Sequence, residues 1–430
     1  MSHDDLTRAG FKERTRIAEA RETILDAVSP HDRTDRVPLA SADGHAVAED
    51  VTAPEPVPSY DRAAMDGFAV QAQDTFGASD RSPAVLRARE GEPGETPVAP
   101  GEAVRVHTGS QLPEGADAVV MVEHTEEVAD EVEVFDAVAE GENVGDAGED
   151  VREGQLLFEK GHQLRPSDLG LLKSVGRDRV EVYRAPTVGV VPTGEELVQH
   201  DPDPGEIIET NGLTVSKLAE HWGAVPTYRD VVTDDRDAIR AAIQRDLTRD
   251  VIVTTGGSSV GERDLTPQVV DDLGEVLVHG VALKPGHPVA LGVVRETPVL
   301  MLPGYPVACI VNAVQFLRPV LKRAGHLPEK PFPTVQARLT RKIKSAPGER
   351  TFARVQVDPV DGGGGGDAAA DGDGDGDAAE PPYVATPTRV SGSGVLSSVA
   401  LADGWVVVPE EREGFAEGET VSVQDWEWSA

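Results

Sequence analysis

The chain has 430 residues, 39% of them hydrophobic, with 76 acidic against 40 basic side chains and a formal net charge of −36. That length exceeds what one compact core accommodates, so we expect two to four domains. The negative charge argues against nucleic acid and anionic lipid as partners, and no apolar run is long enough to cross a bilayer.

A cytoplasmic protein is the simplest interpretation, because the N-terminus is charged and lacks the apolar stretch of a signal peptide. Acidic residues are spread along the chain and arginine outnumbers lysine, as in halophile proteins that work in molar salt. We therefore interpret the charge as adaptation to a strongly screening solvent. The single cysteine, Cys309, excludes an intrachain disulfide and a cysteine metal cluster.

In chain order, an amphipathic helix is expected over 9–27, and short apolar stretches cut by Gly, Pro and Asp over 37–182 indicate mostly β structure. From 187 to about 325, strands alternate with helices, a rhythm that predicts a doubly wound parallel sheet. The expected strands are 187–191, 250–255 and 299–302, and the expected helices are 212–222, 235–247, 267–273 and 307–324. Beyond Pro331, short β segments predict a small barrel or sandwich. The Asp/Gly-rich tract at 361–380 is expected to be a disordered insertion.

The strongest local signal is the run Thr254–Asp264, which follows an expected strand directly and contains the glycines and serines of a loop that can bind an anion. Its glycines allow backbone N–H groups to approach a phosphate, and Asp264 is suited to hold a divalent cation against it. A simple turn with the same composition is an equally good interpretation of this run alone.

Three further loops also follow expected strands: 192–197, 284–288 and 302–306. We expect the glycine-rich run and the two Pro-Gly loops to converge on one edge of the sheet. Lys284 suits a bound oxyanion, although a solvated turn lysine fits as well. Glu196 is suited to bind metal or a substrate hydroxyl, and the alternative is a capping arrangement with Thr193. The segments 63–69, 105–109 and 148–151, taken alone, read as β turns.

Taken together and in this order, these segments resemble the molybdopterin molybdenumtransferase family, which includes the C-terminal region of gephyrin. The resemblance covers nearly the whole chain and adds two C-terminal blocks, 348–354 and 391–396. It implies a multidomain α/β plus β fold with a central molybdopterin-binding domain, mixed or β N-terminal domains and a small β-barrel-like C-terminal domain. The domains expected are 1–56 with 151–183, the inserted 57–150, 184–328, and 329–430.

The resemblance also implies a homodimer with its active site in a cleft between subunits. The reaction implied is insertion of molybdate into adenylylated molybdopterin with Mg²⁺ present, which yields molybdenum cofactor and AMP. The catalytic residues carried over are Asp66, Thr108, Asp150, Asp234 and Asp264, and the metal ligands are Glu196 and Asp264. The substrate-binding residues expected are Gly256, Gly257, Ser258, Ser259, Gly261, Lys284, His287, Pro303, Gly304, Arg350 and Arg354.

The chain departs from the usual family pattern at four positions. His287 stands where lysine is usual, Tyr305 replaces asparagine, Ala308 replaces serine, and Thr233 stands where arginine is often found. These changes affect the anion contacts and leave the carboxylates intact.

Several alternatives stay open beside this function. A molybdopterin adenylyltransferase shares the α/β domain but lacks the N-terminal and C-terminal blocks. A tungstate-inserting paralogue is not separable by sequence, because the two oxyanions have nearly the same size and charge. A non-catalytic scaffold would be expected to lose the carboxylates, which are present here. A binding module for another nucleotide does not account for so many matching blocks.

Overall fold

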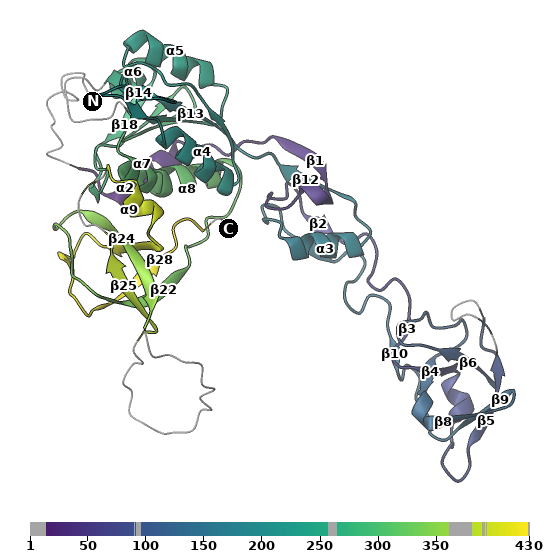
Figure 1. Cartoon of the computed structure of the whole chain (residues 1–430). Helices are drawn as coiled ribbons and strands as arrows, with labels where there is room; N and C mark the ends of the chain where they lie inside the picture. The colour runs from purple at the N-terminus through teal and green to yellow at the C-terminus, as the bar shows by residue number, and fades with distance from the viewer. Residues whose placement is uncertain are drawn as a thin grey trace. The chain divides into compact units, whose positions relative to one another are not determined.

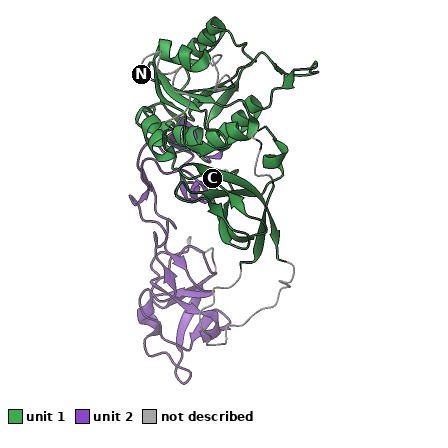
Figure 2. Cartoon of the chain, turned by 90° about the vertical axis from the view of Figure 1, so that its left-hand side faces the viewer, with its two compact units in different colours: residues 1–35, 44–46, 183–430 green, residues 36–43, 47–182 purple. Residues whose placement is uncertain are grey.

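The computed structural model describes residues 14–89, 91, 96–256, 265–360, 381–388, 392 and 394–428 (Figure 1). The chain divides into two compact units (Figure 2). Unit 1 comprises residues 1–35, 44–46 and 183–430, and unit 2 comprises 36–43 and 47–182. The opening helix therefore groups with the α/β domain, whereas the sequence analysis grouped it with 151–183.

Unit 2 is built largely from β structure, as the short apolar stretches predicted. One part of it is a six-stranded sheet in the order β7-β4-β6-β5-β9-β8, in which only β5 and β6 among the described pairs run parallel. Two-stranded sheets β1-β12, β2-β11 and β3-β10 and the helix α3 form the remainder. The bounds are β1 Thr34–Pro38, β2 Val51–Thr52, β3 Arg62–Ala63, β4 Gly67–Val70, β5 Ala84–Arg89, β6 Glu102–Val106, β7 Ala118–Met121, β8 Thr125–Val128, β9 Glu131–Val134, β10 Val144–Gly145, β11 Leu156–Phe158, α3 Pro166–Ser174 and β12 Arg179–Tyr183.

The α/β domain of unit 1 holds a six-stranded sheet in the order β16-β13-β17-β21-β20-β18. The first four strands are parallel, but β20 and β18 run antiparallel to their neighbours. The expectation of a wholly parallel sheet is thus wrong at one edge, because the short connection after β20 turns the chain directly back into β21. The bounds are β13 Thr187–Pro192, β14 Leu197–Val198, β15 Ile207–Ile208, α4 Asn211–His221, β16 Val225–Tyr228, α5 Arg236–Asp246, β17 Val251–Thr255, α6 Leu265–Leu273, β18 Glu275–His279, β20 Ala290–Val294 and β21 Thr297–Leu302.

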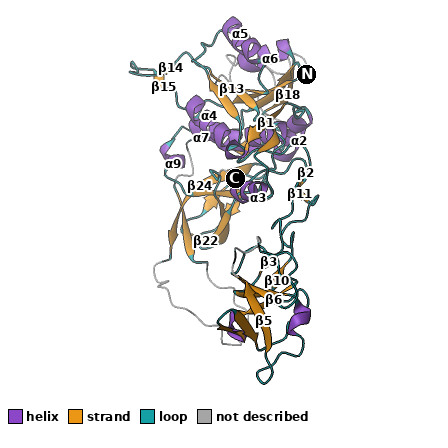
Figure 3. Ribbon diagram, turned by 90° about the vertical axis from the view of Figure 1, so that its right-hand side faces the viewer, coloured by secondary structure: helices purple, strands orange, loops and turns teal. Residues whose placement is uncertain are grey.

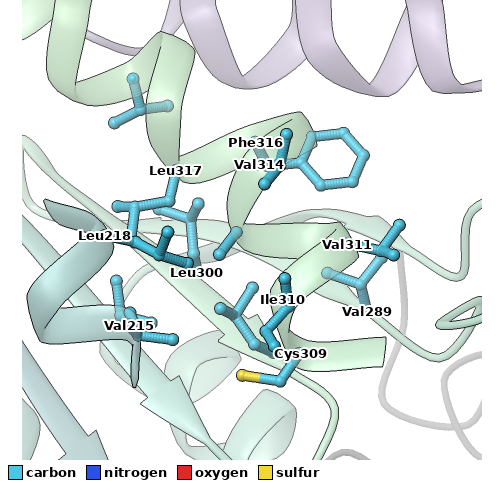
Figure 4. Packing of buried hydrophobic residues seen from close by; sticks show 14 of the residues in the cluster. Val215, Leu218, Val289, Leu300, Cys309, Ile310, Val311, Val314, Phe316 and Leu317 are labelled. Atoms are coloured by element: carbon cyan, nitrogen blue, oxygen red, sulfur yellow. The ribbon is translucent and has the colours of Figure 1, made fainter. Parts of the chain in front are cut away.

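Helices cover both faces of this sheet, since alternate strand residues enter two separate cores. Val251 and Val253 join the cluster formed with α4, α7 and α8, whereas Ile252 joins the cluster formed with α5 and α6. Figure 4 shows Cys309 of α7 packed among residues of the first cluster such as Leu218. Burial raises the pKa of the Cys309 thiol, so this cysteine acts as a core residue. The doubly wound layering predicted from the sequence is confirmed.

The helix expected over 307–324 is interrupted. It consists of α7 (Pro306–Asn312), a π-helical segment (Ala313–Leu317) and α8 (Arg318–Ala324). Pro319 lies at the start of α8 and has no N–H to donate to the preceding turn, which accounts for the local change of hydrogen-bond pattern. The helix expected over 9–27 is described only from Ile17 to Asp26 as α2, which packs against α8.

The C-terminal domain contains a closed barrel, as predicted. Its strands follow the order β24-β25-β22-β28-β26, and β26 pairs back with β24 to close the ring. A further short strand, β19, joins β24 in parallel. The bounds are β19 Leu283–Lys284, β22 Thr334–Leu339, β23 Ile343–Lys344, β24 Arg350–Pro359, β25 Tyr383–Pro387, α9 Ser397–Ala400, β26 Gly404–Val408, β27 Gly414–Phe415 and β28 Thr420–Gln424.

Figure 3 shows β14 and β15 as a short ribbon that extends away from the α/β sheet. Among the described residues, every helix is too short or too polar to span a membrane.

Candidate functional site at the carboxyl edge of the sheet

The carboxyl ends of three adjacent parallel strands meet at one edge of the α/β sheet. Pro192 of β13 pairs with Thr255 of β17, which in turn pairs with Leu302 of β21. The Thr193 N–H donates to the Thr255 carbonyl at 3.2 Å, and the Gly256 N–H donates to the Leu302 carbonyl at 3.0 Å. The loops that follow these strands therefore begin side by side, where open α/β sheets bind ligands.

Two glycines make this close approach possible. Gly256 has φ +124°, and a Cβ at this position would lie 2.1 Å from the Thr193 carbonyl oxygen. A Cβ on Gly304 would lie 3.4 Å from the Cα of Gly256. Only glycine fits at position 256, where the main chain of the two loops comes close together. Pro303, which precedes Gly304, is buried.

Polar residues at the start of α4, which were not among the expected site residues, connect the loops at this edge. The Asn211 side-chain amide donates to the Gly304 carbonyl at 2.7 Å. The buried Glu209 carboxylate accepts the Gly212 N–H at 2.7 Å and the Tyr228 hydroxyl. Polar residues directly before an expected helix are a capping signal, and that signal could have identified these residues.

Two carboxylates meet beside the same edge. Glu196 lies in the loop after β13, and Asp234 lies in the loop before α5. A hydrogen bond of 3.1 Å from the Gly194 N–H to the Val232 carbonyl joins these two loops. Burial and the negative charge of Glu196 raise the pKa of Asp234, although the Glu195 backbone N–H works against the rise. Mutual repulsion of this kind is relieved by a cation between the two groups.

Among the described residues, Glu196 and Asp234 are the carboxylates at this edge that are suited to bind a divalent cation. Carboxylate oxygens are the ligands that Mg²⁺ prefers in proteins. In the described ranges, no three acidic, histidine or cysteine side chains gather into a metal site. The other expected ligand, Asp264, lies outside the described residues, as do Gly257, Ser258, Ser259 and Gly261.

Buried hydroxyl groups lie at the ends of β13 and β17. Thr193, Thr254 and Thr255 are almost fully buried, and their side-chain oxygens have no hydrogen-bond partner within the part of the chain that the structure describes. A buried hydroxyl without a partner costs free energy.

The loop 284–288 does not follow a strand of the α/β sheet, so that part of the expectation is wrong. The strand before it, β19, pairs with β24 of the barrel domain instead, so that Lys284 lies opposite Thr351, next to Arg350. The loop nevertheless contacts α7, because the Asn312 side-chain amide donates to the Gly286 carbonyl at 2.9 Å.

The four basic residues expected to bind the anion differ in exposure, in ion pairing and in charge. Lys284 is exposed. The Arg350 guanidinium binds Glu410 at 2.8 Å, and Arg354 is only 3% exposed. Burial and the nearby Arg14 lower the pKa of His287, so its imidazole is mainly uncharged at neutral pH. Lys284 is thus the best placed of the four to meet an anion.

In unit 2 the structure brings two of the predicted residues together. The Asp66 carboxylate accepts the Thr108 N–H at 2.7 Å and the Thr108 hydroxyl at 3.0 Å. These two hydrogen bonds lower the pKa of Asp66 and keep it ionised. Asp150 is exposed, and its N–H donates to the Val57 carbonyl at 3.0 Å.

The fold defines a class of multidomain proteins built around a doubly wound α/β domain, with β domains before and after it in the chain. Three family models match the chain: the MoeA N-terminal region (domain I and II) over 15–176, a model described as "Probable molybdopterin binding domain" over 189–323 and the MoeA C-terminal region (domain IV) over 377–426. The chain belongs to the MoeA family, and its role lies in molybdenum cofactor biosynthesis, as the sequence resemblance predicted.

Individual relatives support this assignment over almost the full length. A molybdopterin biosynthesis protein of Methanocaldococcus jannaschii is 35% identical over 94% of each chain. The molybdopterin molybdenumtransferase of Bacillus subtilis is 32% identical over 92% of each chain. The crystal structure of a molybdopterin biosynthesis MoeA protein from Pyrococcus horikoshii superposes with a TM-score of 0.80 at 34% identity, covering 96% of this chain and 99% of that one.

Proposed function

We propose that the protein is a molybdopterin molybdenumtransferase that inserts molybdate into adenylylated molybdopterin and releases AMP. The observation that carries the proposal is the close approach of main chain at Gly256 and Gly304, with Glu196 and Asp234 in adjoining loops that the Gly194–Val232 hydrogen bond joins. A phosphate-linked substrate needs close backbone approach at one position and a cation site at the next. This edge of the α/β domain has the close backbone approach, and Glu196 and Asp234 are proposed to supply the cation site.

The chain's own residues then have distinct roles. Gly256 and Gly304 allow a phosphate to approach main chain, and Asn211 holds Gly304 in position. Glu196 and Asp234 would hold Mg²⁺. Bound there, the ion supplies Lewis-acid stabilisation of the negative charge that develops on phosphate oxygens when the bond to AMP breaks. Lys284 offers a positive charge to the oxyanion or to the phosphate.

Asp66 and Thr108 of unit 2 are proposed as further catalytic residues, with Asp150. The hydrogen bonds from Thr108 hold the Asp66 carboxylate in one orientation and in its charged form. A homodimer is proposed as well, and light scattering of the purified protein in high salt tests it. A monomer would contradict a site shared between subunits.

A reconstituted insertion assay in high salt tests the function. Purified protein, adenylylated molybdopterin and Mg²⁺ are mixed with molybdate or tungstate, and AMP release is followed. AMP release that depends on molybdate, with active cofactor formed, supports the proposal. A strong preference for tungstate would indicate the tungstate-inserting alternative. Binding of the adenylate without AMP release under either oxyanion would indicate a scaffold.

The carboxylate pair is tested in the same assay with Asp234→Asn against Asp237→Asn. Asp237 is an exposed acid in the first turn of α5 and lies outside the proposed site. We expect Asp234→Asn to lower Mg²⁺-dependent AMP release by at least tenfold and Asp237→Asn to leave it unchanged. Equal activity of the two variants would remove Asp234 from the metal site.

A further inference from the structure

Tyr305 presents an aromatic ring to solvent beside the candidate site. Aromatic residues make up only 4% of the chain, and two of its tryptophans, Trp222 and Trp405, are fully buried, although Phe76 of unit 2 is as exposed as Tyr305. Tyr305, by contrast, is 65% exposed, directly after Gly304. Leaving such a ring in water forgoes the free energy that its burial would contribute, so core packing does not explain this residue.

Rigid elements hold the backbone of Tyr305. It is the N-cap residue of α7, and its carbonyl accepts the Cys309 N–H at 2.8 Å. Cys309 is itself buried in the core that Figure 4 shows. On the other side, the Gly304 carbonyl is held by Asn211. The ring is therefore carried on a fixed backbone at the edge where Gly304 approaches Gly256.

Among the described residues, a glycine of the C-terminal domain borders the ring. A Cβ on Gly394 would lie 3.4 Å from Cδ1 and 3.7 Å from Cε1 of Tyr305, so a glycine of the C-terminal domain contacts the ring without covering it. Within the part of the chain that the structure describes, the Tyr305 ring is exposed and its hydroxyl makes no hydrogen bond to another residue. An exposed aromatic ring on a backbone that hydrogen bonds hold in place is suited to stack on another planar ring.

We propose that Tyr305 determines substrate recognition by stacking on a planar heteroaromatic ring of the substrate. This inference rests on the proposed function, in which the substrate carries two such rings, the pterin and the adenine. Base–aromatic stacking tolerates any ring with a π-face. The shared chemistry is a flat nitrogen heterocycle next to a phosphate, with the phosphate at Gly256 and Gly304 and the ring on Tyr305.

Calorimetric titration of the full chain in high salt tests this, with AMP and molybdopterin as separate ligands. Tyr305→Ala should weaken binding of one of the two by about tenfold or more, in line with alanine substitutions at stacking sites. Tyr305→Phe should retain wild-type affinity, and Tyr305→Leu should lose it. Tyr383→Ala, which removes an exposed tyrosine of β25, serves as the matched control and should change nothing.

The ligand that loses affinity identifies the ring. In the insertion assay, Tyr305→Ala should raise KM with a smaller change in kcat, because the ring contacts the substrate away from the breaking bond. Unchanged binding of both ligands by Tyr305→Ala, or wild-type affinity in Tyr305→Leu, overturns the stacking proposal while the molybdate-dependent activity of the wild type still stands. A wild-type protein that binds neither ligand overturns the proposed function as well.

Discussion

Replacing Gly256 by alanine tests the geometry of the strand-end site directly. The backbone of Gly256 has φ +124°, which an L-residue with a side chain rarely adopts. The added Cβ would lie 2.1 Å from the Thr193 carbonyl oxygen and 3.2 Å from its hydroxyl oxygen. Carbon–oxygen contacts begin at about 3.3 Å, so the ends of β13 and β17 must separate by roughly 1 Å.

The expected destabilisation has two parts. The backbone strain costs about 1–3 kcal/mol, and forcing the strand ends apart costs about 1–3 kcal/mol more. Gly205→Ala is the matched control, because Gly205 has φ +108° but nothing within 4 Å of its Cβ position. The control carries only the backbone strain, so the difference between the two variants measures the clash with Thr193.

Two measurements separate these parts. Urea unfolding in high salt should show Gly256→Ala to be about 1–3 kcal/mol less stable than Gly205→Ala. AMP release should fall by about 100-fold in Gly256→Ala alone, the usual effect of a 1 Å misplacement at a reacting site. Equal stability and equal activity of the two variants would refute the close approach of Gly256 to Thr193.

Three further outcomes follow from the charged groups. Asp246→Ala leaves Arg229 without its buried carboxylate partner and should cost about 3 kcal/mol in urea unfolding, and a loss near zero would contradict the pairing. Burial opposes ionisation of Asp168, but hydrogen bonds from Arg165 outweigh it and lower the pKa of Asp168 from 3.8 to about 2. A lowered pKa stabilises the fold above the unfolded value, so about 2 kcal/mol should be lost as the pH falls from about 4 to 2, and Asp168→Asn should not show this loss in acid titration of unfolding. The raised pKa of Asp234 gives the opposite pH dependence of stability, because the stabilising contribution of this group is lost as pH rises through its pKa. At neutral pH, Asp234→Asn should therefore melt at a higher temperature than wild type while it loses AMP release. A lower melting temperature of the variant would contradict this.

Local signals predicted much of the fold. The expected strand over 250–255 and the expected helix over 235–247 lie within a residue of β17 and α5, because apolar periodicity and the Asp235 cap are properties of short segments. Where the prediction failed, the cause was not local. The sheet partner of Lys284 lies in the barrel domain, and nothing in the sequence around position 284 indicates which sheet that strand joins.

The candidate site likewise has features that the sequence predicts and contacts that only the tertiary structure shows. The sequence by itself determined the glycine positions, the carboxylates and the family to which the chain belongs, because these depend on residue type and order. Only the tertiary structure decided that Gly194 binds Val232, which joins the loops of Glu196 and Asp234, and that Asn211 binds Gly304, 93 residues further along the chain. Such contacts arise from the parallel pairing of β13, β17 and β21, which brings distant loops to one edge, and local periodicity carries no information about that pairing.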